Sequence, residues 1–442
     1  MFLLYSFLLS VAFVVLLPRF LFQKKYAAGL RQRFGKLPAF EQNERPVLWL
    51  HCVSVGETNA ARPLVKALKE NFPEYRLVVS TTTLTGQNLA GEVFAGDAEL
   101  VFYFPFDWKF TVRRVLKHIK PNVVILMETE LWFNFIRESH KGGARVFIVN
   151  GRLSEKSVRY YGLIPKTMRR VLHHVDLALM QTSADMKRLL GLGSRGTKVR
   201  VTGNIKFDQN FDETESDLTK ELRTRFDFFK NAPLIVAAST HAPEEKWILQ
   251  AFKETRKNFK ANLPRLLIAP RHPERFAEVE NLIKESGFNW AKRSEAVSNG
   301  DKTAEIILLD SIGELRAVYP LAEIVFVGGS LIPHGGQNIL EPAISEKAII
   351  TGFYTMNFAE IVKEFLAQNA LVQLPKTNEN EVAAKLAAAF SELLKDAEKR
   401  EQLAKNAFVV MKKNRGATAK TVEQIKSVLS DNRKIQDSEF KV

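Results

Sequence analysis

The chain has 442 residues, more than a single hydrophobic core usually supports, so we expect two domains. Hydrophobic residues make up 46% and charged residues 26%, a composition typical of a folded rather than a disordered protein. The net charge of +15 indicates an anionic partner, such as nucleic acid, phospholipid or a phosphorylated substrate. The single cysteine, Cys52, excludes an internal disulfide and lies in a strand pattern, where we expect it to be buried.

The N-terminal segment is apolar. Residues 1–17 carry no charge, and a helix of about 22 residues rises ~33 Å, close to the thickness of a membrane's hydrocarbon core. The positive start and the cleavage site of a secretory signal peptide are missing. We expect residues 1–22 to anchor the chain, either as a spanning helix or as a helix lying in the membrane interface. The cations after it predict that the remainder is cytoplasmic: Arg19, Lys24, Lys25, Arg31, Arg33 and Lys36.

From residue 46 onward, short apolar runs alternate with longer amphipathic segments. The first predicted strand, residues 47–50, ends at Ser54-Val55-Gly56-Glu57 and is followed by a predicted helix at residues 58–71. Further strands are predicted at residues 77–79, 100–104, 123–127, 146–149, 177–180 and 199–201. This alternation is typical of a parallel sheet with helices on both faces, so we predict a first doubly wound, Rossmann-like domain at residues 23–208.

The alternation stops at residues 209–231, where an acidic stretch without apolar residues indicates a linker. It resumes in a second predicted doubly wound domain, residues 232–429, followed by a loose polar tail at residues 430–442. Its predicted strands are residues 234–236, 266–268, 306–309, 324–327 and 348–350. Because ligands of such sheets bind at the carboxyl ends of the strands, we expect the chemistry in the loops after strands, around a cleft between the domains.

Three loops of the second half suit a nucleotide. Glycine pairs precede a predicted helix start near Glu341, so backbone N–H groups can approach a phosphate and Glu341 can accept ribose hydroxyls; a tight turn with a capping acid is the alternative. Arg271 and His272 follow another strand, where an arginine fork suits a phosphate, unless they form a plain surface loop. Gly313 and Glu314 permit close approach and can accept a base or ribose donor. We predict that the three loops converge on one crevice.

The first half places acidic residues after its strands. Glu57 begins a helix, whose dipole is expected to lower its pKa, and it either caps that helix or takes a proton from an attacking hydroxyl. Glu128 and Glu130 follow an apolar strand, which favours a role in the cleft. Lys206 follows the last strand of this half and can balance charge on a leaving phosphate. The eight histidines show no metal-ligand spacing, so we predict no metal and no cofactor.

Together these motifs resemble the 3-deoxy-D-manno-octulosonic acid (Kdo) transferases of lipopolysaccharide assembly. Their order and spacing hold over residues 20–425. The matching segments are Arg33-Phe34-Gly35, Ser54-Val55-Gly56-Glu57, Thr83-Leu84-Thr85-Gly86, Glu128-Thr129-Glu130-Leu131-Trp132, Asn150-Gly151-Arg152-Leu153-Ser154, Gly203-Asn204-Ile205-Lys206-Phe207-Asp208, Ser239-Thr240-His241, Pro270-Arg271-His272-Pro273-Glu274-Arg275-Phe276, Gly313-Glu314-Leu315, Gly328-Gly329-Ser330-Leu331 and Asn338-Ile339-Leu340-Glu341-Pro342.

The resemblance implies a GT-B glycosyltransferase with a CMP-Kdo donor, a lipid A precursor (lipid IVA) as acceptor, no metal, and a place on the cytoplasmic side of the inner membrane among its phospholipids. It implies that Glu57 is the general base and that Glu128 and Lys206 stabilise the transition state. It also implies a CMP site lined by Arg271, His272, Ile312, Gly313, Glu314, Asn338, Ile339, Leu340 and Glu341.

Four positions depart from the family pattern. Gln337 stands where His is usual, Phe133 and Leu84 replace Pro, and Gly151 replaces Ala. Gln337 keeps its hydrogen bonds but cannot titrate, so we assign it no catalytic role.

The expected reaction inverts the anomeric centre. Candidate contacts for acceptor phosphates, each of which is otherwise a solvated helix face, are Arg113, Arg114, Lys117, Lys166, Arg169 and Arg170. A different membrane-associated GT-B enzyme that uses a UDP-sugar is one alternative, and the run of family motifs argues against it. A non-catalytic, basic membrane-binding or nucleic-acid-binding protein is the other; it leaves the acids after the strands unexplained, and we expect no nucleic-acid partner.

Overall fold

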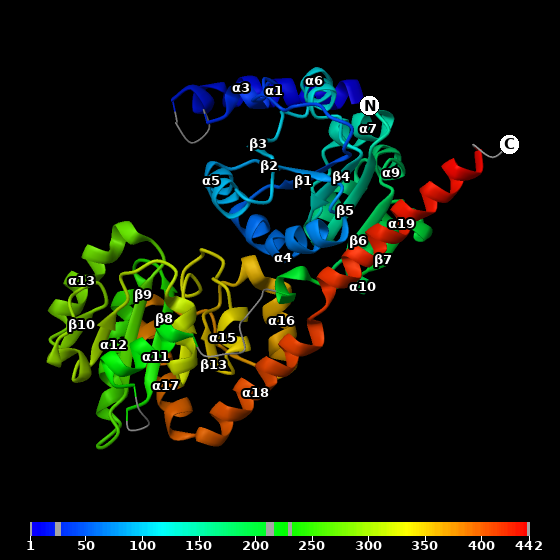
Figure 1. The fold of residues 1–442 in the computed structure, drawn as a ribbon. Helices are drawn as coiled ribbons and strands as arrows, with labels where there is room; N and C mark the ends of the chain where they lie inside the picture. The colour runs from blue at the N-terminus through cyan, green and yellow to red at the C-terminus, as the bar shows by residue number, and fades with distance from the viewer. Residues whose placement is uncertain (1, 23–27, 209–215, 229–231, 440–442) are drawn as a thin grey trace. The chain divides into compact units, whose positions relative to one another are not determined.

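The computed structural model describes residues 2–22, 28–208, 216–228 and 232–439, which form two compact units (Figure 1). Unit 1 comprises residues 1–210 and 414–442, and unit 2 comprises residues 211–413. Each unit contains one seven-stranded sheet in which all paired strands are parallel. The predicted α/β class with two parallel sheets is therefore confirmed.

The sheet of unit 1 has the strand order β3-β2-β1-β4-β5-β6-β7. Its interior strand β1 pairs with β2 and β4, so that Leu50 lies opposite both Val79 and Ile125. These strands consist of apolar runs because both faces of the sheet are covered, and Cys52 is buried as expected. The strands are β1 (Val47–Cys52), β2 (Arg76–Thr81), β3 (Leu100–Tyr103), β4 (Val123–Met127), β5 (Arg145–Gly151), β6 (Leu177–Met180) and β7 (Val199–Val201).

Helices pack on the two faces of this sheet in two separate apolar clusters. One cluster joins α4 (Val55–Asn71) to the C-terminal helix α19 (Ala417–Glu439), and the other joins helices on the opposite face to Trp49 and Val124. Those opposite helices are α6 (Lys109–Ile119), α7 (Phe133–Lys141), α9 (Pro165–His173) and α10 (Ser183–Gly191). The remaining elements are α3 (Leu30–Arg33), α5 (Leu84–Val93), α8 (Glu155–Gly162), η1 (Gly196–Lys198) and η2 (Ile205–Asp208).

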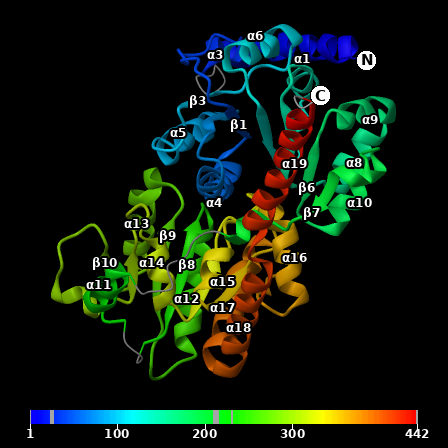
Figure 2. The same ribbon diagram turned by 45° about the vertical axis from the view of Figure 1, so that its right-hand side comes forward.

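The N-terminal segment forms helix α1 (Phe2–Phe22), which lies on unit 1 beside α6 (Figures 1 and 2). Tyr5 packs against Phe133 with ring centroids 4.8 Å apart, and the indole N–H of Trp108 donates to Ser10 over 2.9 Å. Phe13 contacts the ring of Trp108 at 5.1 Å. In the part of the chain that is described, no helix combines the length and the apolar composition needed to cross a bilayer.

The C-terminal helix α19 belongs to unit 1, where it lies along α4 (Figure 2). Its Val422 and Ile425 join the cluster of Leu64 and Leu68, and the Asp208 carboxylate accepts the backbone N–H of Gly416 over 2.7 Å at the start of the helix. The structure thus differs from the predicted boundary at residue 429, because α19 returns to the first sheet. Helical backbone also continues to Glu439, through most of the segment that we expected to be a loose tail.

Unit 2 has the strand order β10-β11-β9-β8-β12-β13-β14. Its strands are β8 (Leu234–Thr240), β9 (Arg265–Pro270), β10 (Trp290–Lys292), β11 (Ile306–Leu308), β12 (Ile324–Val327), β13 (Ala348–Thr351) and β14 (Val372–Gln373). Its helices are α11 (Asp217–Phe226), α12 (Glu244–Lys257), α13 (Phe276–Glu285), α14 (Leu315–Val318), α15 (Leu340–Ile344), α16 (Ala359–Ala367), α17 (Glu379–Lys395) and α18 (Ala397–Asn414).

Helices α12 and α17 lie side by side on one face of this second sheet (Figures 1 and 2). Phe252 of α12 and Phe390 of α17 are fully buried in one cluster with the strand residues Ile235 and Phe326. The predicted linker at residues 209–231 falls partly outside the described residues, and its described part includes α11. The buried clusters between helices and strands fix both sheets, and the loops at the carboxyl ends of the strands begin from these fixed positions.

Candidate active site

Glu57 lies in the first turn of α4, shortly after β1, an interior strand of the sheet. Its carboxylate accepts the backbone N–H of Val53 over 2.8 Å and the hydroxyl of Ser54 over 3.3 Å, so it satisfies donors at the helix start as a capping acid does. The residue is only 7% exposed. Burial, and then the negative charges of Glu128 and Glu130, raise the pKa of Glu57 from 4.5 to about 8. The expectation that the helix dipole lowers this pKa is therefore wrong, because burial and the neighbouring acids outweigh it.

Glu128 and Lys206, predicted to act together, are in direct contact. The Lys206 ammonium lies 3.2 Å from one carboxylate oxygen of Glu128, and the guanidinium Nε of Arg152 lies 2.7 Å from the other. The backbone of Glu128 has a φ of 54°, a strained value for a residue with a side chain. Glu57, Glu128 and Arg152 follow β1, β4 and β5, which are consecutive strands in the sheet, so the fold gathers them at one edge.

Polar contacts, one of them fully buried, fix the loops that carry these side chains. The side-chain oxygen of Asn150 accepts the backbone N–H of Ile205 over 3.1 Å, and that of Asn204 accepts the N–H of Lys206 over 3.0 Å. The backbone N–H of Arg152 donates to the hydroxyl of Thr129 over 2.9 Å. The sequence analysis assigned no role to Asn150 or Arg152, although both belong to the family motif Asn150-Gly151-Arg152-Leu153-Ser154, which follows the predicted strand at residues 146–149. An arginine at that position was the signal that could have been used.

At the carboxyl end of the first sheet, a candidate proton acceptor, Glu57, lies near the cations Arg152 and Lys206, both of which pair with Glu128. A carboxyl group with a pKa near 8 binds a proton more strongly than an ordinary glutamate, which favours general base catalysis near neutral pH. The two cations meet a single carboxylate, that of Glu128, and can also attract a further anion. Burial raises the pKa of Glu130 as well, so this edge holds protons readily.

In unit 2, Arg271 and His272 follow β9, and both side chains are exposed at the carboxyl end of the sheet. The backbone N–H of Arg271 donates to the carbonyl of Thr240 over 3.0 Å, which joins this loop to the last residue of β8. The His272 ring lies 3.8 Å from Glu274. Both predicted phosphate-binding side chains are thus available to a ligand in this unit.

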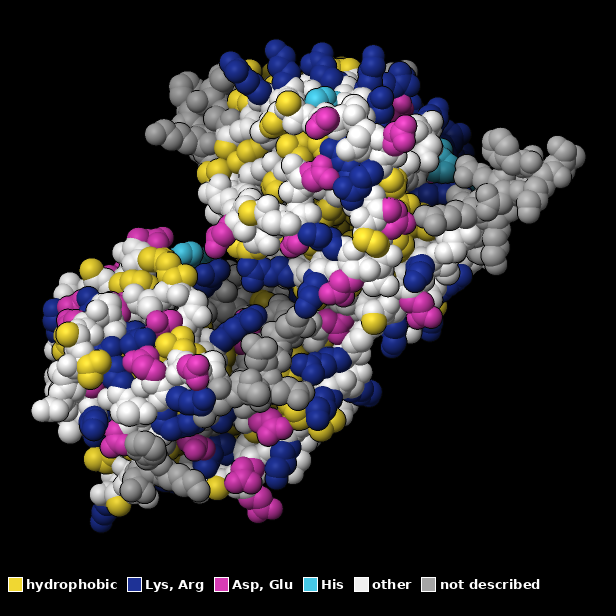
Figure 3. All heavy atoms as spheres, in the orientation of Figure 1, with side chains coloured by type: hydrophobic (Ala, Val, Ile, Leu, Met, Phe, Trp, Pro, Cys, Tyr) yellow, Lys and Arg dark blue, Asp and Glu magenta, His cyan; other side chains and the backbone are white. Residues whose placement is uncertain are grey.

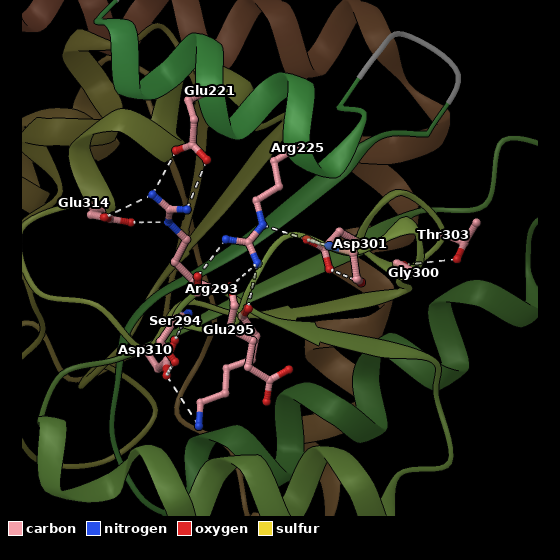
Figure 4. A network of polar contacts seen from close by, with 12 residues as sticks. Glu221, Arg225, Arg293, Ser294, Glu295, Gly300, Asp301, Thr303, Asp310 and Glu314 are labelled. Carbon is pink, nitrogen blue, oxygen red and sulfur yellow. Dashed lines mark hydrogen bonds and ion pairs between the residues drawn. The ribbon is translucent and has the colours of Figure 1, made fainter.

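The loop after β11 holds Ile312, Gly313 and Glu314. Ile312 is 80% exposed, and Gly313 has a φ of 86° with open space where a side chain would lie. The Glu314 carboxylate forms an ion pair of 2.7 Å with Arg293 (Figure 4). Burial alone would raise the pKa of Glu314, but its bonds to Arg293 and Ser311 hold the pKa below its usual value. This predicted ribose or base acceptor is therefore already paired with a cation that we did not predict.

Arg293 belongs to a larger polar network that fixes α11 to the β10–β11 region (Figure 4). It also pairs with Glu221 of α11 over 2.9 Å. Nearby, the buried Arg225 of α11 lies 2.7 Å from Asp301 and donates to the backbone carbonyls of Arg293 and Glu295 over 2.8 and 2.9 Å. The orientation of Glu314 thus depends on residues distant in sequence.

The third predicted loop runs from β12 to α15. Asn338 accepts the backbone N–H of Leu340 over 3.1 Å, and Glu341 pairs with Arg316 over 3.3 Å. Ile339 and Leu340 are 1% and 0% exposed, so their side chains pack inward and only their backbone can face a ligand. The strand order places β8 between β9 and β12, so the β12 loop and the β9 loop flank the loop after β8.

The predicted contacts for acceptor phosphates do not share one place. Arg113 pairs with Glu138 over 2.6 Å, whereas Arg169 and Arg170 line a cavity of about 340 Å³ with Leu172, His173, Gly193 and Arg195. Its lining residues come from α9, which precedes β6, and from the loop that leads through η1 into β7. The cavity therefore lies at the amino ends of these strands, whereas Glu57 lies at the carboxyl ends. Within the described ranges, no group of three or more His, Cys, Asp or Glu could hold a metal ion.

A family model and a curated relative both place the chain in the same family. The model of the 3-deoxy-D-manno-octulosonic-acid transferases (kdotransferases) matches residues 28–209. A 3-deoxy-D-manno-octulosonic acid transferase of Haemophilus influenzae is 34% identical over 92% of this chain and 93% of its own length. A solved C-terminal CMP-Kdo binding domain of WaaA from Acinetobacter baumannii is 32% identical, covering 44% of this chain and 95% of that domain, with a TM-score of 0.39.

A glycosyltransferase structure from Rickettsia africae is 13% identical and covers 88% of this chain and 99% of that one, with a TM-score of 0.57. At that identity the similarity concerns the fold alone, and it supports a GT-B-like fold with two parallel-sheet domains.

Proposed function

Because this chain belongs to the 3-deoxy-D-manno-octulosonic acid (Kdo) transferase family and transfers Kdo in lipopolysaccharide biosynthesis, we propose that its donor is CMP-Kdo and its acceptor is the lipid A precursor lipid IVA. The observation that carries the proposal is the cluster at the carboxyl edge of the first sheet. There, a buried glutamate with a pKa of about 8 lies near a carboxylate that is held by a lysine and an arginine.

Each unit supplies a different part of the reaction. Glu57 accepts the proton of an acceptor hydroxyl, whose oxygen then attacks the anomeric carbon of the donor from the face opposite the phosphate. The new carbon–oxygen bond forms as the bond to the phosphate oxygen breaks, and CMP leaves with the additional negative charge. Arg271 and His272 bind that phosphate through charge and directional hydrogen bonds. The anomeric centre is inverted.

Glu128 and Lys206 contribute opposite charges to the transition state. As the phosphate leaves, positive charge develops on the sugar ring, which a carboxylate stabilises. Lys206 balances negative charge, and Arg152 keeps the Glu128 carboxylate oriented when Lys206 is engaged elsewhere. Glu57 needs to be ionised to act, and positive charge that develops beside Glu128 lowers the pKa of Glu57 because it offsets one of the negative charges that raise that pKa.

We propose that the protein acts at the surface of the inner membrane, with α1 lying in the interface between lipid and water. One stripe of α1 faces away from unit 1 and stays exposed, in the i, i+3, i+4 spacing of a helix face: Leu4 (56%), Phe7 (63%), Leu8 (57%), Val11 (45%), Val14 (65%) and Val15 (71%). Lys and Arg side chains gather over the neighbouring α6 (Figure 3), where Arg113, Arg114 and Lys117 are exposed. An apolar stripe beside cations favours anionic phospholipid.

The test is a transfer assay with purified full-length protein, lipid IVA and CMP-Kdo, followed by mass spectrometry of the lipid. We expect mass increments of whole Kdo residues. Glu57→Ala is expected to abolish them while CMP still raises the melting temperature of the variant. Unmodified lipid IVA with wild-type protein that binds CMP would refute the acceptor, and near-normal turnover of the Glu57 variant would remove it as the base.

A further inference from the structure

Three histidines of unit 2 come together at the carboxyl end of its sheet, beside the residues proposed for the donor phosphate. The ring of His241, in the loop after β8, has its centroid 5.2 Å from that of His272 and 4.5 Å from that of His334. The side-chain amide nitrogen of Gln337 lies 3.0 Å from Nε2 of His241. Neither the family-derived CMP contacts nor the transfer mechanism uses His241, His334 or Gln337.

The buried carboxylate of Glu244 fixes the two loops that carry this cluster. The Glu244 carboxylate is fully buried and accepts the backbone N–H groups of His241, Gly329, Ser330 and Leu331 over 2.7–3.0 Å. One acid therefore ties the loop after β8 to the loop after β12. At Gly328, which follows β12, a Cβ would lie 2.6 Å from the carbonyl oxygen of Ser239 near the end of β8, so this position has no room for a side chain.

The hydrogen-bonding roles in the cluster follow from Gln337. An amide nitrogen only donates, so Nε2 of His241 is the acceptor and the imidazole proton lies on Nδ1. Burial, and then the charges of His334, His272, Arg271 and Arg275, lower the pKa of His241 to about 4, which keeps its ring neutral at physiological pH. Arg275 is already engaged by two acids, Glu245 at 2.6 Å and Glu278 at 2.7 Å, whereas the side chain of Arg271 is exposed. The cluster thus offers N–H donors in surroundings of positive charge, which suit an anion.

We propose that His241, His334 and Gln337 form a subsite for the carboxylate of the transferred sugar acid. In a CMP-activated 2-keto sugar acid, the carboxylate is attached to the same carbon as the phosphate oxygen, so its binding group needs to lie next to the phosphate-binding group. His241 meets that condition, since it contacts His272. A nucleotide sugar without a carboxylate gains nothing there, so the subsite selects sugar acids over neutral sugars.

The inference rests on the proposed function, and two ligands separate them. Calorimetric titration of full-length protein with CMP reports the nucleotide site alone, whereas CMP-Kdo reports both. We expect His241→Asn to weaken CMP-Kdo binding by about tenfold or more, the worth of one hydrogen bond to a charged group, and to leave CMP binding within about twofold. Gln337→Glu is expected to weaken CMP-Kdo further, because it brings a second negative charge to the carboxylate.

The control variant is Gln402→Glu on the exposed surface of α18, which is expected to change neither the CMP affinity nor the CMP-Kdo affinity. Equal losses for CMP and CMP-Kdo in the His241 and Gln337 variants would overturn the subsite, as would unchanged CMP-Kdo binding. If wild-type protein bound neither CMP nor CMP-Kdo, the proposal that CMP-Kdo is the donor would be refuted, and the subsite proposal would be refuted with it.

Discussion

Replacing the buried base with its neutral isostere, Glu57→Gln, is expected to stabilise unit 1 while abolishing transfer. The folded protein keeps a proton on Glu57 up to about pH 8, whereas the unfolded chain releases it near the ordinary value of 4.5. Between these two values the folded state binds more protons, so the stability of the wild type falls as the pH rises. Glutamine carries no such cost, and its amide oxygen can still accept the N–H of Val53.

The magnitude follows from the pKa values. The interval from 4.5 to neutral pH is about 2.5 units, and about 1.4 kcal/mol per unit gives a penalty of about 3 kcal/mol at pH 7. In a unit of this size, 1 kcal/mol moves the melting temperature by about 2–4 °C, so Glu57→Gln is expected to melt roughly 6–12 °C higher at pH 7. The difference is expected to vanish near pH 4.5 and to reach its limit above pH 8.

Differential scanning fluorimetry of full-length protein at pH 4.5 to 8.5 measures this difference. Glu70→Gln, an exposed position on the same helix, is the matched control and is expected to follow the wild type at every pH. The reasoning is refuted if Glu57→Gln melts at or below the wild-type temperature at pH 7.5, or if its advantage does not grow with pH.

Three other predictions concern catalysis and the membrane. Wild-type kcat/KM is expected to rise with pH and level off above about pH 8, as the base ionises; a flat profile between pH 6 and 9 contradicts this assignment. Lys206→Met leaves Glu128 with one cation of two and is expected to lower kcat by about 10²–10³ with CMP binding retained; loss of both signals a folding defect instead of a catalytic one. Phe7→Asp with Val15→Asp is expected to lower co-flotation with phosphatidylglycerol vesicles, whereas Val409→Asp on α18 is expected not to; equal binding by all three proteins argues against α1 as the contact.

The fold could be predicted from sequence because each buried strand is a short, local apolar run. Val123–Met127, for example, is apolar throughout, which signals a strand covered on both faces without reference to the rest of the chain. The acids after β1 and β4 were found for the same reason, since a charge directly after such a run has no packing role to play. Glu128 and Lys206, to which the resemblance assigned a role in the transition state, lie 3.2 Å apart, a contact that was not predicted.

The features that could not be predicted from the sequence depend on contacts between residues that lie far apart along the chain. The pKa of Glu57 rises because burial and Glu128, 71 positions later, act on it together, whereas the helix terminus that argued for a low pKa is local. Glu314 is engaged by Arg293 from a different strand end. The docking of α1 and the return of α19 to the first sheet also depend on side chains that meet only after folding.

The return of α19 has a consequence for how the protein is made. Unit 1 is assembled from both ends of the chain, with the whole of residues 211–413 synthesised in between. As the ribosome works from the first residue to the last, the apolar surface of α4 that receives Val422 and Ile425 waits uncovered until the final stretch emerges. A message truncated by a few dozen codons therefore yields a product with an intact second sheet and a first sheet that lacks part of its covering, which quality-control proteases can recognise.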